Sequence, residues 1–194
     1  MINKRFFNEI FVQEIYAPAK TLGHMSTVLD VGATTGEFSL WIQHMADVIY
    51  AIEGNKELLS HLIENVFDFP HIIPFNIAIG NENRMGHMTG SSDGHPHGLM
   101  NGGSRLSHDA TPTPYDIPVY TLATLMKECN MRTIDVLKID IEDGEKEVFE
   151  ASDFKDVAPY IKMIIGEHVS HSSGITLKEL GFTEIQKGAY YIRQ

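Results

Sequence analysis

Short apolar runs alternate along the chain with stretches whose apolar residues recur at helical spacing. Runs of strand length occupy residues 27–31, 48–52, 71–79, 134–139 and 161–165. Helical spacing extends over residues 2–17, 37–45, 55–66, 122–129, 143–151 and 175–180. Strands that alternate with helices form a parallel sheet with right-handed crossovers and helices on both faces. The pattern therefore predicts a three-layer α/β sandwich.

The end of the chain departs from this alternation. Residues 182–185 and 190–193 read as two strands around the short turn Lys187–Gly188, which predicts an antiparallel hairpin added to the parallel sheet. A chain of 194 residues is long enough for one core, so we expect a single domain over residues 1–194. Its residues 1–22 would form an N-terminal helical segment, interrupted at Pro18.

Residues 81–118 follow neither period and are rich in glycine, proline and histidine. We predict a long flexible loop there, either ordered by a ligand or a tolerated insertion without a function. Its histidines, His87, His95, His97 and His108, lack the second well-spaced pair of a metal site, so a surface loop is the better interpretation.

The composition and charge of the chain disfavour several classes of function. The formal net charge is -11, which disfavours nucleic acid as a partner. The chain contains no apolar run of about 18 residues, so the sequence predicts no membrane span. The single Cys129 and the acidic residues near the start argue for a cytoplasmic protein without a signal peptide. No metal site is predicted, although Asp140, His171 and their acidic neighbours have suitable ligand types.

The stretch VLDVGATTGEF, Val28 to Phe38, reads as a strand, a glycine turn and the start of a helix. It contains no lysine, which excludes a P-loop, and Gly32 and Gly36 do not fit the dinucleotide pattern G-x-G-x-x-G. Glycines let a ligand approach the backbone closely. Asp30, two residues before the first glycine, favours a cation such as an ammonium or a sulfonium.

A second acid, Glu53, follows the second predicted strand. A carboxylate at that place accepts hydrogen bonds from both hydroxyls of a ribose. A cation-binding acid at the first turn and a ribose-binding acid after the second strand together suit S-adenosylmethionine.

Six blocks of the chain resemble, in order and spacing, the FkbM-type S-adenosylmethionine-dependent methyltransferases. They span about residues 27–168 and read VLDVGATTGEFSL, VIYAIEGN, FNIAIGNE, VYTLATL, IDVLKIDIEDGEKEVF and MIIGEH. The resemblance implies a class I methyltransferase fold, Rossmann-like, with a mostly parallel seven-stranded sheet and an antiparallel terminal hairpin. The implied cofactor-binding residues are Asp30, Gly32, Ala33, Thr34, Gly36 and Glu53, with Asn76 and Ile77 on the adenine side.

The chain departs from the family pattern at two places. The family often has asparagine where this chain has Thr34, and Gly-Ala where it has Asp143–Gly144. The first difference affects one turn contact. The second adds a carboxylate that would alter acceptor preference, or would act only as a charge at a helix N-terminus.

Methylation of a hydroxyl needs a base close to the acceptor, because alcohols are very weak acids. Asp140 and Glu142 follow the fourth long strand, and Glu167 and His168 follow the fifth, so all four are expected at one rim of the sheet. We take His168 or Glu167 as the candidate base and Asp140 as the residue near the methyl group. Alternatively, these acids cap helices or pair with lysines such as Lys138 and Lys146.

The favoured function is O-methylation of a sugar, glycan or secondary metabolite, with a small-molecule or glycan acceptor as partner. Two other readings stay open: a non-catalytic S-adenosylmethionine-binding module, and a nicotinamide-binding fold, which the missing second turn glycine disfavours. The chain is short for an enzyme that recognises a large acceptor, so a homo-oligomer or another subunit would have room to complete the pocket.

Overall fold

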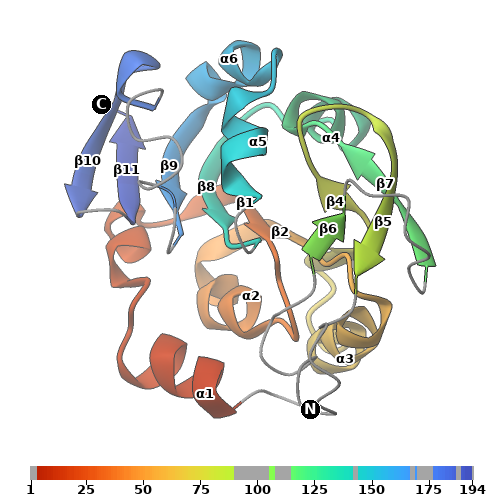
Figure 1. Ribbon diagram of the computed structural model, residues 1–194. Helices are drawn as coiled ribbons and strands as arrows, with labels where there is room; N and C mark the ends of the chain where they lie inside the picture. Colours follow the sequence, from red (N-terminus) through yellow and green to blue (C-terminus); the bar gives the residue numbers. More distant parts are fainter. Residues whose placement is uncertain are drawn as a thin grey trace.

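A seven-stranded sheet forms the centre of the computed structural model, which describes residues 4–89, 105–107, 115–141, 144–166, 169, 177–186 and 189–193. Its strands are β1 (Met25–Val31), β2 (Ala46–Ile52), β3 (Ile72–Phe75), β8 (Ile134–Ile139), β9 (Ile161–Ile165), β10 (Phe182–Gln186) and β11 (Tyr190–Arg193). Their order is β10-β11-β9-β8-β1-β2-β3 (Figure 1). Among these described strands, β11 alone runs against the others: it pairs antiparallel with β9 and with β10, and the other neighbouring strands are parallel. The predicted mostly parallel sheet with an antiparallel hairpin is confirmed.

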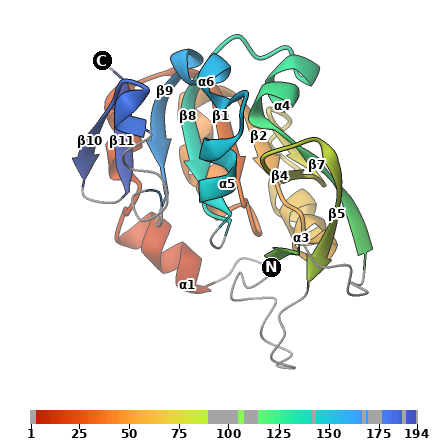
Figure 2. The same ribbon diagram turned by 45° about the horizontal axis from the view of Figure 1, so that its top comes forward.

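Helices cover both faces of this sheet because side chains alternate along each strand. Leu29 and Leu137 point into one core, and Val28 and Val136 into the other. The first core is closed by α4 (Leu122–Glu128), α5 (Glu145–Glu150) and α6 (Phe154–Val157). Helix α6 continues as η5 (Ala158–Tyr160). Figure 2 shows α5 in front of β8. The second is closed by α2 (Glu37–Ile42), with its extension η3 (Gln43–Met45), and by α3 (Lys56–Val66). The three-layer prediction is thereby confirmed.

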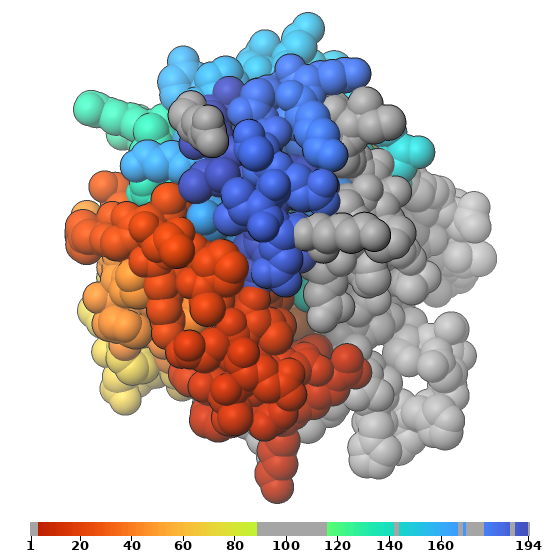
Figure 3. Space-filling model, turned by 90° about the vertical axis from the view of Figure 1, so that its left-hand side faces the viewer, coloured from red at the N-terminus to blue at the C-terminus, as the bar shows by residue number. Residues whose placement is uncertain are grey.

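The N-terminal segment is less regular than its sequence pattern predicts. It consists of α1 (Lys4–Phe7), a π-helical turn η1 (Asn8–Val12) and a 3-10 helix η2 (Ala17–Leu22), with Pro18 in the first turn of η2. Ile10 and Tyr16 are buried in the second core. The Tyr190 hydroxyl donates a hydrogen bond to the carbonyl of Ile15, and Figure 3 shows the segment lying against the C-terminal strands. The two ends of the described chain therefore pack together.

A second, smaller sheet was not predicted. It has the order β4-β7-β5-β6, with β4 (Ala78–Ile79), β5 (Arg84–Thr89), β6 (Arg105–Ser107) and β7 (Tyr115–Tyr120). The prediction of a loop over residues 81–118 is therefore wrong for these strands, and the single strand predicted over residues 71–79 is split between two sheets. Burial of Met88, Ile117 and Val119 explains the pairing of β5 with β7.

Residues 90–104 and 108–114 of the same stretch, with His95, His97 and His108, lie outside the described residues. His87 is on β5, where its Nδ1 lies 2.6 Å from Oδ1 of Asp116 on β7. Over the described ranges, no helix is both long and apolar enough to cross a membrane.

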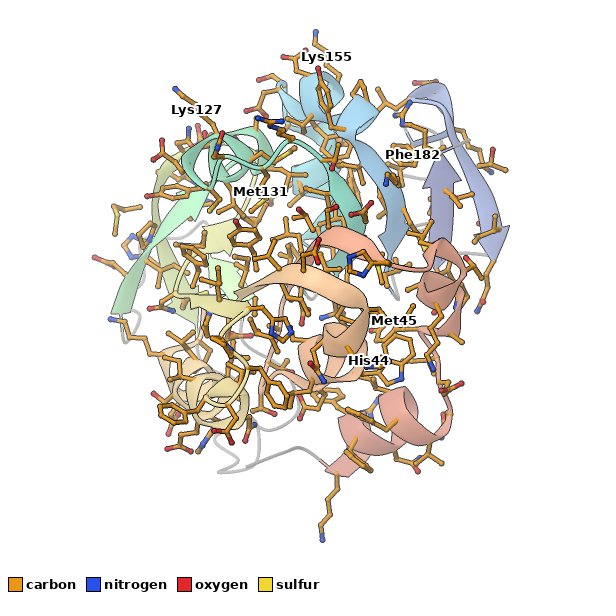
Figure 4. All side chains as sticks on the ribbon, turned by 180° about the vertical axis from the view of Figure 1, so that it is seen from behind. His44, Met45, Lys127, Met131, Lys155 and Phe182 are labelled. Carbon is orange, nitrogen blue, oxygen red and sulfur yellow. The ribbon has the colours of Figure 1, made fainter. Side chains whose placement is uncertain are left out.

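Two exposed lysines lie at the edge of the main sheet where the parallel strands begin. Lys127 on α4 and Lys155 on α6 are exposed and point outward at that end (Figure 4). The glycine turn, Glu53 and Asp140 lie at the opposite edge, where the parallel strands end.

Candidate cofactor and acceptor site

The glycine turn joins β1 to α2 and rests on the carboxyl ends of two neighbouring strands. Gly32 has φ +77°, and a Cβ at this position would collide with the carbonyl oxygen of Asp140. The amide groups of Gly32 and Ala33 both donate to the carbonyl of Ile52, over 3.0 and 2.9 Å. Only glycine fits the first turn position, and the turn is fixed without any ligand.

Gly36 allows two helices to pack closely and does not provide an open surface for a ligand. Its φ is +94°, and a Cβ there would lie 2.7 Å from Cδ1 of Leu62 on α3. Its amide closes the turn by donating to the carbonyl of Ala33 over 2.8 Å, and Ala33 is itself buried. Gly36 therefore allows α2 to approach α3 closely.

Asp30 is fully buried beneath the turn. Lys138 is its direct partner in the register of β1 and β8, and Lys138 Nζ lies 3.2 Å from Asp30 Oδ1. Ser39 Oγ donates to Asp30 Oδ2 over 2.7 Å. Burial lowers the pKa of Lys138, but the nearby Asp30, Tyr16 and Asp140 together outweigh it, Asp30 most of all, and the pKa lies above its ordinary value. We expected Asp30 to face a ligand cation; in the structure the cation beside it is a lysine of the chain.

Lys138 also holds the turn itself. Its Nζ donates to the carbonyl of Gly32 over 2.7 Å and lies 3.5 Å from that of Val31. A buried lysine is stable only when its charge is paired and its donors are used. Lys138 therefore links the strand carrying Asp140 to the backbone of the turn.

Glu53 follows β2 and closes the other side of the turn. Its Oε2 accepts a hydrogen bond from the Thr34 amide and its Oε1 from the Asn55 amide, both over 2.8 Å. Thr34 has φ +50°, and its amide is therefore aimed at Glu53 from a left-handed conformation. Burial raises the pKa of Glu53 to about 7, although the two amides oppose the shift. Each carboxylate oxygen can accept a further hydrogen bond.

Asn76 and Ile77, expected on the adenine side, have different environments. Asn76 Nδ2 donates to the carbonyls of Glu53 and Gly54, over 2.9 Å each. Ile77 is buried in the core of the α4–α5 face. Asn76 thus holds the chain that carries Glu53, whereas Ile77 packs.

The second sheet contributes a wall next to Glu53. A Cβ at Gly54 would lie 3.1 Å from both Ile117 Cδ1 and Met88 Sδ. Ile117 and Met88 are buried and come from the paired strands β7 and β5. The stretch predicted as a loop therefore supports the position of the candidate ribose-binding acid.

Asp140 lies at the end of β8, beside the turn. Its amide donates to the carbonyl of Val31 over 3.0 Å, and it is partly exposed. Of the other candidate catalytic residues, Glu142, Glu167 and His168 lie outside the described residues. The alternative pairing of Lys146 is with Glu150, at 3.8 Å.

Comparison with known proteins identifies the family. The family model described as the methyltransferase FkbM domain matches residues 30–185, most of the chain. The chain belongs to the FkbM methyltransferase family. No curated protein matches this FkbM-family chain.

Solved structures of similar fold are methyltransferases at low sequence identity. The FkbM methyltransferase of Methylobacillus flagellatus KT has a TM-score of 0.53 and 12% identity, with 88% of this chain and 43% of that chain covered. The N-methyltransferase NodS of Bradyrhizobium japonicum WM9 has a TM-score of 0.53 and 8% identity, with 99% of both chains covered. The precorrin-6y C5,15-methyltransferase of Geobacter metallireducens GS-15 has a TM-score of 0.51 and 14% identity, covering 93% and 86%. These likenesses show the class I methyltransferase fold.

Sequence reasoning missed the contacts of three residues that shape the candidate site of this FkbM-family protein, although it named Lys138 as a possible partner of the strand-end acids. Lys138 and Ser39 hold Asp30, and the Oε1 of Glu145 accepts the amide of Ile141 over 2.8 Å in the turn after Asp140. A lysine inside the apolar run IDVLKI was a usable signal, because a charge in a buried strand needs a partner. Nothing in the sequence singled out Ser39.

Proposed function

We propose that this protein is an S-adenosylmethionine-dependent methyltransferase that methylates a hydroxyl group of a sugar, glycan or secondary metabolite. One observation carries the proposal: a preformed glycine turn lies between Glu53 on one side and Asp140 on the other, at the carboxyl ends of β1, β2 and β8. In open α/β sheets this edge is where ligands bind.

The residues at this edge fit the donor. Glu53 is held by two amides and has acceptor capacity left for the ribose hydroxyls. Asn76 fixes the chain around Glu53, and the turn at Gly32 would lie along the amino-acid part of the donor. When bound, S-adenosylmethionine supplies an electrophilic methyl group on a positively charged sulfur.

The chain would supply alignment and proton removal. Asp140 is the partly exposed acid beside the turn, so we assign it the role of orienting the acceptor hydroxyl near the methyl group. His168 or Glu167 stays the proposed base, on the sequence argument that both follow the neighbouring strand β9. A base must lie within about 3 Å of the hydroxyl proton that it removes.

The test combines binding with turnover. Titration calorimetry should detect binding of S-adenosylmethionine and S-adenosylhomocysteine, and Glu53→Ala should weaken both by roughly 1–3 kcal/mol. A panel of sugars and alcohols with a methyl-labelled donor should then identify an acceptor. Binding without transfer to any hydroxyl, amine or carbon acceptor would favour the non-catalytic module, and absence of binding would refute the proposal.

A further inference from the structure

We propose that Lys138 is a positioning residue that cancels the charge of Asp30 under the donor turn, so that the attraction for a cationic ligand comes from Asp140. The inference rests on the proposed function, because it concerns how this site treats a sulfonium. The two carboxylates would have different roles. Asp30 would help to fix the conformation of the turn, and Asp140 would attract the cationic ligand.

Asp30 and Lys138 form a buried ion pair. The two side chains are direct partners in the β1–β8 register, 3.2 Å apart, and are 0% and 6% exposed. The second oxygen of Asp30 is occupied by Ser39. A buried carboxylate paired with a buried ammonium contributes little net charge to its surroundings.

The peptide groups on both sides of Gly32 are fixed in orientation. Lys138 Nζ binds the Gly32 carbonyl over 2.7 Å, and the Gly32 amide is bound to Ile52 over 3.0 Å. The carbonyl therefore points down to the lysine. Without Lys138, this carbonyl and the Asp30 carboxylate would both present negative charge at the turn.

Asp140 has a more open position than Asp30. It follows Lys138 by two residues, and its amide bonds to Val31 next to the turn, so it continues the same face of the sheet. It is partly exposed, and within the described ranges no ion pair engages its carboxylate. Its charge also helps to raise the pKa of Lys138, but less than the charge of Asp30 does, and Asp140 is partly exposed, so we assign the attraction for a ligand cation to it.

Charge neutrality at the turn has a chemical consequence. Methyl transfer from a sulfonium to a hydroxyl neutralises the sulfur, since the carbon–sulfur bonding electrons stay on sulfur while the base takes the hydroxyl proton. A second uncompensated carboxylate near the sulfur, added to the charge of Asp140, would stabilise the cationic ground state further than the transition state and slow the reaction. The Asp30–Lys138 pair avoids this loss.

The experiment measures how strongly each variant prefers the cationic donor to its neutral product. Titration calorimetry gives the dissociation constants of S-adenosylmethionine and S-adenosylhomocysteine, and their ratio reports the charge felt at sulfur. The variants are Lys138→Met, Asp30→Asn and the double variant with both changes. Lys146→Met is the matched control, because it removes an exposed lysine of a surface ion pair.

The expected pattern has opposite signs for the two single variants. Lys138→Met should shift the ratio toward the sulfonium by roughly tenfold, Asp30→Asn should shift it away by a similar factor, and the double variant and the control should stay within about threefold of the wild type. If Lys138→Met does not fold, the ratios of dissociation constants for Asp30→Asn and for the double variant still test the proposal.

Three results would distinguish a failure of the charge-compensation proposal from a failure of the proposed function. A ratio that is unchanged in Asp30→Asn, or that moves in the same direction in both single variants, overturns the charge-compensation proposal while donor binding stands. A double variant that keeps the shift of a single variant also overturns it. If the wild-type protein binds neither ligand, the proposed function itself fails.

Discussion

The protonation of Glu53 should leave a measurable trace in the pH dependence of stability. This carboxyl group is buried, with a pKa raised from 4.5 to about 7 in the folded protein. A raised folded-state pKa means that the folded protein holds a proton that the unfolded chain has already lost. The contribution of Glu53 is therefore fully present below about pH 4.5 and is lost as the pH rises through 7.

The magnitude follows from the size of the shift. A displacement from 4.5 to about 7 corresponds to about 3 kcal/mol, at about 1.4 kcal/mol per pH unit. The wild-type free energy of unfolding should thus fall by about 3 kcal/mol between pH 4 and pH 8 relative to a variant with no ionisable group at this position. Glu53→Gln is that variant.

The substitution has a second, pH-independent effect that must be separated. The glutamine amide group would replace one oxygen that accepts from Thr34 or Asn55, which costs about 1–3 kcal/mol for an unpaired buried donor. The comparison therefore concerns the slopes of the two stability curves rather than their heights. Other groups titrate equally in both proteins and cancel.

The assay is urea unfolding followed by circular dichroism, at intervals between about pH 4 and pH 8. Exposed Glu128→Gln is the control, and its curve should stay parallel to that of the wild type. Parallel curves for wild type and Glu53→Gln over the whole range would refute the argument, because they would mean that Glu53 titrates alike in the folded and unfolded chains.

Three further predictions concern the residues around the turn. Gly32→Ala should destabilise the fold by about 2 kcal/mol or more and abolish donor binding, because its Cβ collides with the Asp140 carbonyl; urea unfolding and calorimetry check both, and a stable, binding-competent variant would contradict the turn geometry. Asn76→Ala removes two hydrogen bonds to the carbonyls of Glu53 and Gly54, so product affinity should fall by about 1–3 kcal/mol, and unchanged affinity would show that Asn76 does not hold the ribose side. Asp140→Asn should lower turnover about 100-fold with S-adenosylhomocysteine affinity retained, which single-turnover assays measure; full activity would remove it from the acceptor site.

The sequence was sufficient for the parts of the fold whose pattern is local. The parallel strands follow from short apolar runs, and the N-terminus of α3 follows from Asn55, whose side chain accepts the amides of Glu57 and Leu58. The terminal hairpin follows from two strand-like stretches around a short turn. In each case neighbouring residues alone carry the signal.

The second sheet could not be predicted for a physical reason. Gly86 and Pro118 fall within its two central strands and hide the alternation that would reveal them. The buried side chains of Met88 and Ile117, on the paired strands β5 and β7, instead lie beside Gly54, on the loop after β2. A signal of this kind lies in tertiary packing and not in local periodicity.

The sequence placed two candidate site acids correctly relative to the strands, but it did not predict the residues packed against them. Glu53 lies where the sequence placed it, at the tip of β2 beside the turn. Asp30 also lies where it was placed, yet its charge is taken by Lys138, because the register of β1 and β8 brings together residues that are far apart in the chain. Such pairings depend on strand register, which sequence patterns specify poorly across long connections.

Three carboxylates at one edge of the sheet therefore differ through their surroundings alone. Asp30 is buried and compensated by Lys138, Glu53 is buried with a pKa of about 7, and Asp140 is partly exposed. Groups whose environments separate their protonation behaviour can take different roles in one reaction. A cation arriving at the turn would meet one closed pair, one acid that titrates near neutral pH and one open charge. Two acids near a glycine turn thus locate a candidate site, but the residues packed against each acid decide which of them would be available to a ligand.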